Sequence, residues 1–263
     1  MTERLATLLA LLNTSRWEDE QLLLRLYRDK TVAIVGPAGY LEEYDVTEAV
    51  RSADVVVRPN CRVDVDRRVL LLPKRTSTRC DVVYHSGLAL GERQQGPAGR
   101  MIATGHSSAL SNGTLAVYAA HGVNAIVMTE LRRQRLVHFQ QLAPPTTLAL
   151  LTPRPFVLAA HQFHTGMKAL LDVLRHRPRR VLIFGYDFYQ TQKRAYRGYY
   201  SELERRAVVP EVMGNAAWHN TEAELAHFRD EVLARHPEVV VDDHLKWVLA
   251  KWSTTRARTA HSR

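Results

Sequence analysis

A histidine and an acidic residue that could move a proton together stand in the segment WHNTEAE. His219 precedes a predicted helix, and Glu224 follows it by five residues. An imidazole titrates near neutral pH and is the usual general base, and a neighbouring carboxylate can orient the ring and raise its basicity. The segment therefore indicates a candidate base with a supporting acid. A surface or helix-capping histidine would give the same pattern.

Three other segments carry residues whose backbone or amide groups could hold an anionic ligand. They are VAIVGPAGY and VVVRPN, which each end a predicted strand, and HTG, which opens a predicted helix. Amides at a helix start bind phosphate, and an asparagine amide both donates and accepts hydrogen bonds. The residues concerned are Gly36, Ala38, Gly39, Asn60, Thr165 and Gly166. An ordinary tight turn, a turn asparagine or an N-cap by Thr165 explains each segment equally well.

Metal ligands are weakly indicated. Asp64 and Asp66 in RVDVDRR form the DxD pattern with which nucleotide-sugar enzymes hold a divalent cation between diphosphate oxygens. However, valines alternate with these aspartates and arginines flank them, as in an exposed strand or turn. His161 and His164 are spaced as HxxH, without a third ligand nearby in the sequence. We therefore expect no metal.

Strands and helices alternate along the chain, and this alternation positions the candidate residues. Apolar, β-branched runs predict strands at 31–36, 54–60, 79–85, 124–130, 156–160, 181–186 and 238–244. Caps and helical spacing predict helices at 15–30, 40–53, 165–176 and 221–236, and residues 87–113 form a predicted long loop. The fold class is therefore α/β, with a single Rossmann-like domain over 1–252 and a mostly parallel sheet with helices on both faces. The basic segment 253–263 is a predicted disordered tail.

Composition narrows the class of protein. The 263 residues are 46% hydrophobic, and no apolar run is long enough to span a bilayer. Two cysteines, Cys61 and Cys80, are too few for a disulfide framework, so we expect a reduced, cytoplasmic protein. The net charge of +9 could serve nucleic acid, an anionic surface or a phosphorylated substrate. No zinc-finger spacing or RNA-binding aromatic motif accompanies it, so a nucleic-acid partner is not favoured.

Four segments of the chain, taken in order, resemble motifs of the sialyltransferase family of the animal type, glycosyltransferase family 29. The whole chain resembles a divergent, bacterial-type member of that family. VAIVGPAGYLEEYDVTEAVRSADVVVRPN resembles its long motif, and HTGMKALLDVLRHRPRRVLIFGYD resembles its short motif. The segment from Tyr199 to Glu202 stands where the family has its third motif. His219 and Glu224 match the very short motif, His-x-x-x-x-Glu. Order and spacing agree from about Thr31 to Glu224, which is most of the chain.

The resemblance implies a sialyltransferase-like variant of the GT-A fold and a metal-independent, inverting transfer of a sugar from a CMP-linked donor to a small-molecule or glycan acceptor. His219 would take the proton of the acceptor hydroxyl, supported by either Glu224 or Glu202, and Tyr199 would donate to the leaving phosphate. No cofactor is required beyond the nucleotide-sugar. The residues implied to hold the nucleotide are Gly36, Ala38, Gly39, Asn60, Thr165, Gly166, Gly185 and Tyr186.

The chain departs from the family at several positions. Pro37 stands where the first turn usually has asparagine, His164 replaces the serine of the short motif, and Tyr199 replaces the histidine of the third. Neither cysteine lies in the short motif, so the disulfide of the family is absent. Two alternatives follow: a UDP-sugar transferase acting on a nucleobase or nucleoside, with a metal on Asp64 and Asp66, or a non-catalytic protein that binds nucleotides or nucleic acid.

Overall fold

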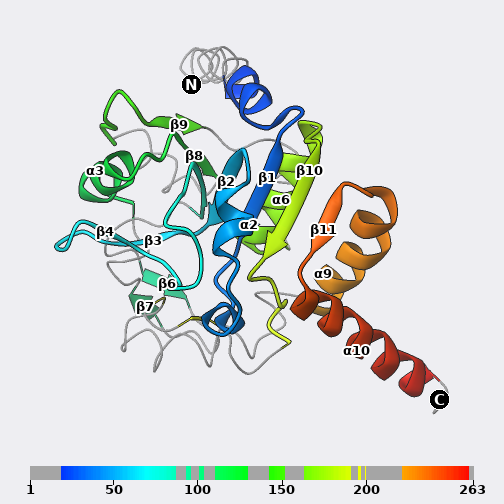
Figure 1. Ribbon diagram of the computed structural model, residues 1–263. Coiled ribbons are helices and arrows are strands. Elements are labelled where there is room, and N and C mark those ends of the chain that lie inside the picture. The colour runs from blue at the N-terminus through cyan, green and yellow to red at the C-terminus, as the bar shows by residue number, and fades with distance from the viewer. Residues whose placement is uncertain are drawn as a thin grey trace, which may run out of the picture.

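A seven-stranded sheet forms the centre of the protein, in a computed structural model that describes residues 19–86, 93–95, 101–103, 110–129, 142–151, 163–190, 195–196, 199 and 221–260. The strand order is β11-β10-β1-β2-β5-β8-β9, and every neighbouring pair is parallel (Figure 1). The strands are β1 (Thr31–Val35), β2 (Val55–Pro59), β5 (Val82–His85), β8 (Ala125–Met128), β9 (Ala149–Leu151), β10 (Arg180–Phe184) and β11 (Val239–Val241). The predicted α/β class and parallel sheet are confirmed.

The central strands are buried along nearly their whole length, as parallel strands covered on both faces must be. Their valine and isoleucine side chains alternate between the faces, so that Val32 and Ile34 enter one core and Ala33 and Val35 enter another. Six of the predicted strands are confirmed. Strand β9 was not predicted, and the predicted strand at 156–160 lies outside the described residues.

Helices cover both faces of the sheet, as predicted. One core joins the strands to helical residues 19–27 and to helices α6 (Thr165–Arg175), α9 (Thr221–His227) and α10 (Asp243–Ala260). The opposite face is covered by α3 (Asn112–Ala120), by α2 (Thr47–Arg51) and by the short 3-10 helix η1 (Gly39–Glu42).

The structure corrects several predicted elements. The helix predicted at 40–53 is divided into η1 and α2, because the Asp45 carboxylate accepts the Thr47 amide at 2.9 Å and turns the chain between them. The helix predicted at 221–236 continues from α9 into a π-helix, Phe228–Leu233. The structure adds two antiparallel hairpins, β3 (Arg62–Asp64) with β4 (Val69–Leu71) and β6 (Arg93–Gln95) with β7 (Met101–Ala103), the first at the strand or turn indicated around Asp64 and Asp66. The second of these lies in the predicted loop.

The C-terminal segment also differs from the prediction, because α10 continues to Ala260 and so includes most of the predicted disordered tail. Trp252 is buried, and the Arg229 guanidinium lies 4.7 Å from the centre of its ring. This contact anchors the helix just before the polar segment, and an anchored helix extends at little cost per residue. Within the described ranges, none of the helices has both the length and the apolar composition to cross a membrane.

The strand order creates one distinctive position in the sheet. From β1 the chain proceeds through β2, β5, β8 and β9 on one side, and then returns through α6 to β10 and β11 on the other. The direction of winding therefore reverses between β1 and β10. Ligands of open α/β sheets bind beyond the carboxyl ends of the strands at such a reversal. That edge lies toward the bottom of Figure 1, where η1 and the start of α10 are found.

Candidate active site

Asn60 connects three elements at the carboxyl edge of the sheet. It directly follows β2, with a left-handed φ of 47° that turns the chain out of the strand. Its amide nitrogen Nδ2 donates to Thr165 Oγ1 at 3.1 Å, and its Oδ1 accepts the Ser86 amide at 3.2 Å. The side chain thus ties the ends of β2 and β5 to the start of α6, and it joins two residues, Asn60 and Thr165, that the sequence had singled out 105 positions apart.

The first turn of α6 is capped by a histidine. His164 is the N-cap, and its Nδ1 accepts the Met167 amide at 2.9 Å. The alternative of an N-cap at Thr165 is wrong, because Thr165 is already the first helical residue. Burial lowers the pKa of His164 to about 4, so the ring is neutral at pH 7. Since Nδ1 accepts a hydrogen bond, the proton of the neutral ring is on Nε2.

Glu224 contacts the same turn. Its side chain, on α9, is fully buried; Oε1 accepts the His164 amide, and Oε2 lies 3.7 Å from His164 Nε2. A carboxylate that accepts a backbone amide at a helix start stabilises the positive end of the helix dipole. Glu224 therefore supports α6 directly. His219 lies outside the described residues, so its pairing with Glu224 stays a prediction.

Tyr186 explains two of the predicted glycines. A Cβ atom on Gly36 would lie 2.9 Å from its ring, and a Cβ atom on Gly166 would lie 2.6 Å from its hydroxyl oxygen. The Tyr186 hydroxyl is buried and has no hydrogen-bond partner among the described residues. Burial raises the pKa of this phenol well above its usual value, and the nearby Glu224 charge raises it further. The Tyr186 ring is therefore packed tightly between the turn at Gly36, after β1, and the start of α6.

The two strand-end turns at the reversal of winding pack on each other. The Gly36 amide donates to the Phe184 carbonyl at 2.8 Å, and the Ala38 amide donates to the Gly185 carbonyl at 3.0 Å. Gly185 has a φ of +72°, and a Cβ atom there would lie 2.4 Å from the Gly36 oxygen. The amides of Gly36 and Ala38, which we expected to face a phosphate, therefore bond within the protein. The third predicted residue of this turn, Gly39, begins η1.

Tyr199 lies beside Asn60. Its hydroxyl donates to the Asn60 carbonyl at 3.4 Å, and the Arg62 guanidinium lies 4.6 Å from the centre of its ring, as in a cation–π contact. The neighbouring Tyr196 donates its amide to the Pro37 carbonyl at 3.0 Å. These contacts hold Tyr196 and Tyr199 against the residues that follow β1 and β2. Arg62 was not predicted, and its one sequence signal is its place two residues after Asn60.

A buried lysine adds positive charge near the start of α6. Lys168 is 5% exposed, and its ammonium group donates to the Thr129 carbonyl at 3.4 Å. Its charge contributes to the low pKa of His164. The sequence prediction missed Lys168, although a lysine on the buried face of an amphipathic helix is an informative exception, because isolated charges are rarely buried.

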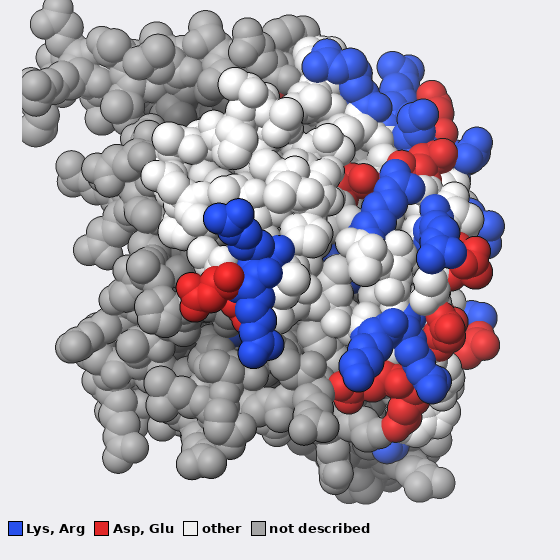
Figure 2. All heavy atoms as spheres, turned by 60° about the vertical axis from the view of Figure 1, so that its left-hand side comes forward, with Lys and Arg blue, Asp and Glu red and all other residues white. Residues whose placement is uncertain are grey.

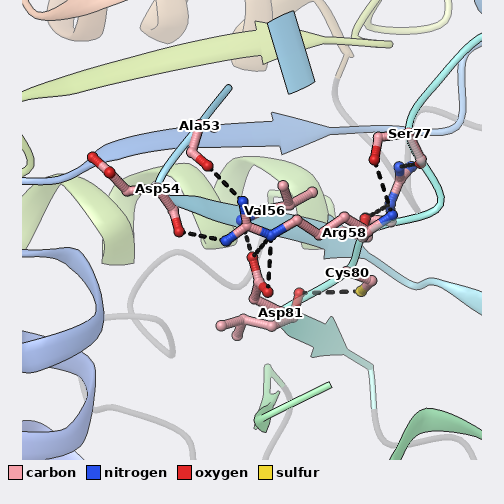
Figure 3. Close-up of polar contacts among 9 residues, drawn as sticks. Ala53, Asp54, Val56, Arg58, Ser77, Cys80 and Asp81 are labelled. Carbon is pink, nitrogen blue, oxygen red and sulfur yellow. Dashed lines mark hydrogen bonds and ion pairs between the residues drawn. The ribbon is translucent and has the colours of Figure 1, made fainter. Parts of the chain in front are cut away.

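Arg58, two residues before Asn60, has a structural role. Its side chain runs along the sheet to the segment before β5, where it donates to the Ser77 carbonyl at 2.5 Å and to the Arg79 carbonyl at 3.0 Å (Figure 3). Arg58 therefore fixes a loop over the sheet. Cys61 and Cys80 are both buried free thiols.

The acidic pair does not form a metal cluster. Asp64 ends β3 and accepts the Arg67 amide at 3.0 Å, and its carboxylate lies 3.6 Å from the Arg67 guanidinium, in the turn of the β3–β4 hairpin. Asp66 is exposed in the same turn. Among the described residues, no group of three histidine, cysteine or acidic side chains could hold a metal ion. His161 lies outside the described residues.

Charges on the described surface are mixed. On the face shown in Figure 2, basic and acidic side chains are mixed along the right-hand side, and another group of both signs lies left of centre among uncharged residues. A protein that binds nucleic acid is expected to carry a broad basic patch. The described part of this face has no broad patch of either sign.

Comparison with known proteins shows a distant similarity of fold. No protein-family model and no curated protein matches the sequence. A mammalian sialyltransferase in complex with Gal-beta-1-3GalNAc-ortho-nitrophenol is 15% identical, with 88% of this chain and 79% of that chain covered and a TM-score of 0.46. The sialyltransferase CstII from Campylobacter jejuni, in complex with the substrate analogue CMP-3FNeuAc, is 14% identical, with 82% and 88% covered and a TM-score of 0.45.

Proposed function

We propose that this protein is a glycosyltransferase that moves a sugar from a CMP-linked donor to an acceptor hydroxyl with inversion of configuration. One observation carries the proposal. The four segments that resemble the sialyltransferase motifs lie far apart in the sequence, and residues of all four meet around the start of α6. Asn60 of the long motif bonds Thr165 of the short motif, Tyr199 of the third motif bonds Asn60, and Glu224 of the very short motif bonds His164.

The surroundings suit an anionic nucleotide. Of the amides at the start of α6, that of His164 is bonded to Glu224 and that of Met167 to the His164 ring, so the Thr165 and Gly166 amides are the two that we propose face the ligand. The buried Lys168 adds positive charge, which offsets the carboxylate of Glu224 at the same turn. Asn60 lies at the junction of strand ends and helix, where its side chain could exchange its present hydrogen bonds for bonds to a nucleotide. Tyr199 and Arg62 lie on its other side.

The proposed reaction is a single displacement. The acceptor oxygen attacks the anomeric carbon while His219 takes the hydroxyl proton. The bond from that carbon to the phosphate oxygen of CMP breaks, and the phosphate leaves with the electron pair. The Thr165 and Gly166 amides and Lys168 stabilise the negative charge that develops on the leaving group. Glu224 contributes by holding the helix start in place. The role of His219 rests on the sequence resemblance.

Titration calorimetry with CMP, CDP, UMP and UDP, each with magnesium and with a chelator, tests the donor. We expect CMP to bind equally well in both conditions, and Asn60→Ala to weaken CMP binding about tenfold through loss of an orienting hydrogen-bond group. The matched control is Asn124→Ala, an exposed asparagine at the opposite edge of the sheet, which should bind as wild type. A preference for UDP with magnesium would replace this proposal by the UDP-sugar alternative.

Turnover separates an enzyme from a binding protein. His219→Ala should lower transfer from a CMP-sugar by about 10²- to 10⁴-fold while the Kd for CMP is retained. If the wild-type protein binds CMP but hydrolyses or transfers none of a panel of CMP-sugars, a non-catalytic nucleotide-binding protein is the better description.

A further inference from the structure

An aromatic platform lies at the carboxyl edge of the sheet, away from Asn60. We use this name for Tyr44, His244 and Trp247, which are joined through the His244 ring: its centre lies 6.1 Å from that of Tyr44 and 5.8 Å from that of Trp247. Tyr44 is 49% exposed and Trp247 is 52% exposed. The other large hydrophobic residues that are exposed in the described chain are Val65 and Val69, so both exposed aromatic residues belong to this one cluster.

The platform is held rigidly from below. The His244 ring stacks on Tyr40, with 3.8 Å between ring centres and an angle of 17°. Tyr40 is buried, and its hydroxyl accepts the Gly185 amide at 2.7 Å and donates to the Asp242 carboxylate. Asp242 also accepts the Leu245 amide at 2.8 Å at the start of α10. The central ring of the platform, His244, is thus fixed before a ligand binds and loses little conformational freedom on binding.

The platform belongs to the same edge as the candidate site. Tyr44 follows η1 after β1, and His244 and Trp247 belong to the first turns of α10 after β11. Figure 1 shows η1 and the start of α10 at the lower end of the sheet. The platform is connected to the strand ends through Tyr40, which stacks on His244 and accepts the amide of Gly185, the glycine that packs on Gly36.

We propose that the aromatic platform binds a pyranose ring of the acceptor glycan, an inference that rests on the proposed glycosyltransferase function. The apolar C–H face of a pyranose carries a small positive potential and stacks on the negative face of an aromatic ring. Charged residues of α10 could bond its hydroxyl groups: Asp243 and Lys246, whose side chains lie 2.8 Å apart, and Lys251, whose ammonium lies over the Trp247 ring at 5.0 Å from its centre and would move aside for the sugar. Charges of both signs suit a neutral polyhydroxyl ligand better than an anion or a cation.

Saccharide binding without any nucleotide tests the platform. Tryptophan fluorescence and saturation-transfer NMR would be recorded during titration with methyl β-galactopyranoside, lactose and cellobiose, with sorbitol as a probe that has the hydroxyl groups but no ring. We expect millimolar binding of at least one of the three ring sugars and none of sorbitol. Trp247→Ala should raise the Kd about tenfold, and Trp247→Phe, which keeps an aromatic face, should stay within about threefold of wild type.

The outcomes separate this inference from the proposed function. If Trp247→Ala and Tyr44→Ala bind the ring sugars as wild type does, or if no ring sugar binds to the wild type, the platform proposal is overturned whatever CMP does. If the sugars bind through Trp247 but CMP does not bind, the platform stands and the transferase proposal fails. Sedimentation velocity provides the remaining test: a wild-type dimer that Trp247→Ala converts to a monomer would assign the surface to a second copy of the chain and overturn the sugar site.

Discussion

At the scale of single residues, Tyr186 and His164 determine what their neighbours can be. Tyr186 occupies the space that side chains on Gly36 and Gly166 would need. His164 joins the backbone of α6 to Glu224 of α9 and remains neutral because it is buried. Packing against Tyr186 thus explains why positions 36 and 166, which look like parts of a phosphate-binding sequence, are glycines.

Gly166→Ala tests the packing around Tyr186. Alanine in place of glycine in a helix usually stabilises by up to about 1 kcal/mol, but here the new methyl group would meet the Tyr186 hydroxyl at 2.6 Å, so we expect a net loss of about 1–3 kcal/mol in the free energy of unfolding. The matched control is Gly113→Ala, also at the second position of a helix. Its Cβ atom would meet the tip of the exposed Val65 at 3.0 Å, and this side chain can move. Urea denaturation compares the two; equal losses would refute the explanation.

His164 predicts a pH dependence of stability. Its pKa in the folded protein, about 4, lies below the ordinary 6.5, so the unfolded chain binds the proton more readily. The contribution of the neutral His164 ring to the free energy of unfolding is therefore complete above pH 6.5 and is lost as the pH falls toward 4. At pH 5 the free energy of unfolding would be lower by about 2 kcal/mol. His164→Asn keeps an N-cap without the titration, so its free energy of unfolding should fall less between pH 7.5 and pH 5, by about that amount. An identical pH profile for the two proteins would contradict this role.

At the scale of elements, the turns after β1, β10 and β11 are joined by one side chain. Tyr40 in η1 bonds Gly185 after β10 and Asp242 after β11. Its hydroxyl therefore connects the segments that follow three neighbouring strands of the sheet, β1, β10 and β11. The division of the predicted helix at 40–53 makes this possible, because the short η1 directs Tyr40 into the sheet edge.

Tyr40→Phe should therefore destabilise the fold. The change removes one hydroxyl, which takes the acceptor of the Gly185 amide and one of the donors to the Asp242 carboxylate, and we expect a loss of about 1–3 kcal/mol in the free energy of unfolding. Tyr44→Phe removes the same atom from an exposed ring and should change stability by less than about 0.5 kcal/mol. Thermal and urea unfolding would measure both, and a Tyr40→Phe protein as stable as Tyr44→Phe would show that the shared hydroxyl contributes little.

At the scale of the whole molecule, the strand order places the candidate site and the aromatic platform on one edge of the sheet. The reversal of winding between β1 and β10 brings the start of α6 to the end of β2 and leaves β11 as the outer strand, beside the platform. A donor bound near Asn60 and an acceptor bound on the platform would thus approach from two ends of the same edge. The net charge of +9 is mixed with acidic residues on the described face of Figure 2 and defines no separate binding surface there.

Local sequence was enough to determine the class of fold. The β-branched runs of β1, β2, β5, β8 and β10 specify buried strands, and the apolar spacing of α6 specifies a helix, because both patterns depend on neighbours in the chain. The candidate residues Asn60, Thr165, Tyr199 and Glu224 could also be named from sequence, since they stand at the ends of these elements or in motifs whose spacing is visible.

Only the tertiary structure decided what those residues touch. The pairing of Glu224 with His164, the capping role of His164, the direction of Arg58 and the grouping of Tyr44 with Trp247 all join segments distant in the sequence. No periodicity encodes such contacts, because they arise from the order in which strands enter the sheet. For the same reason the glycines at 36 and 166 suggested a phosphate turn from sequence, while the fold showed the tyrosine that fills the space beside them.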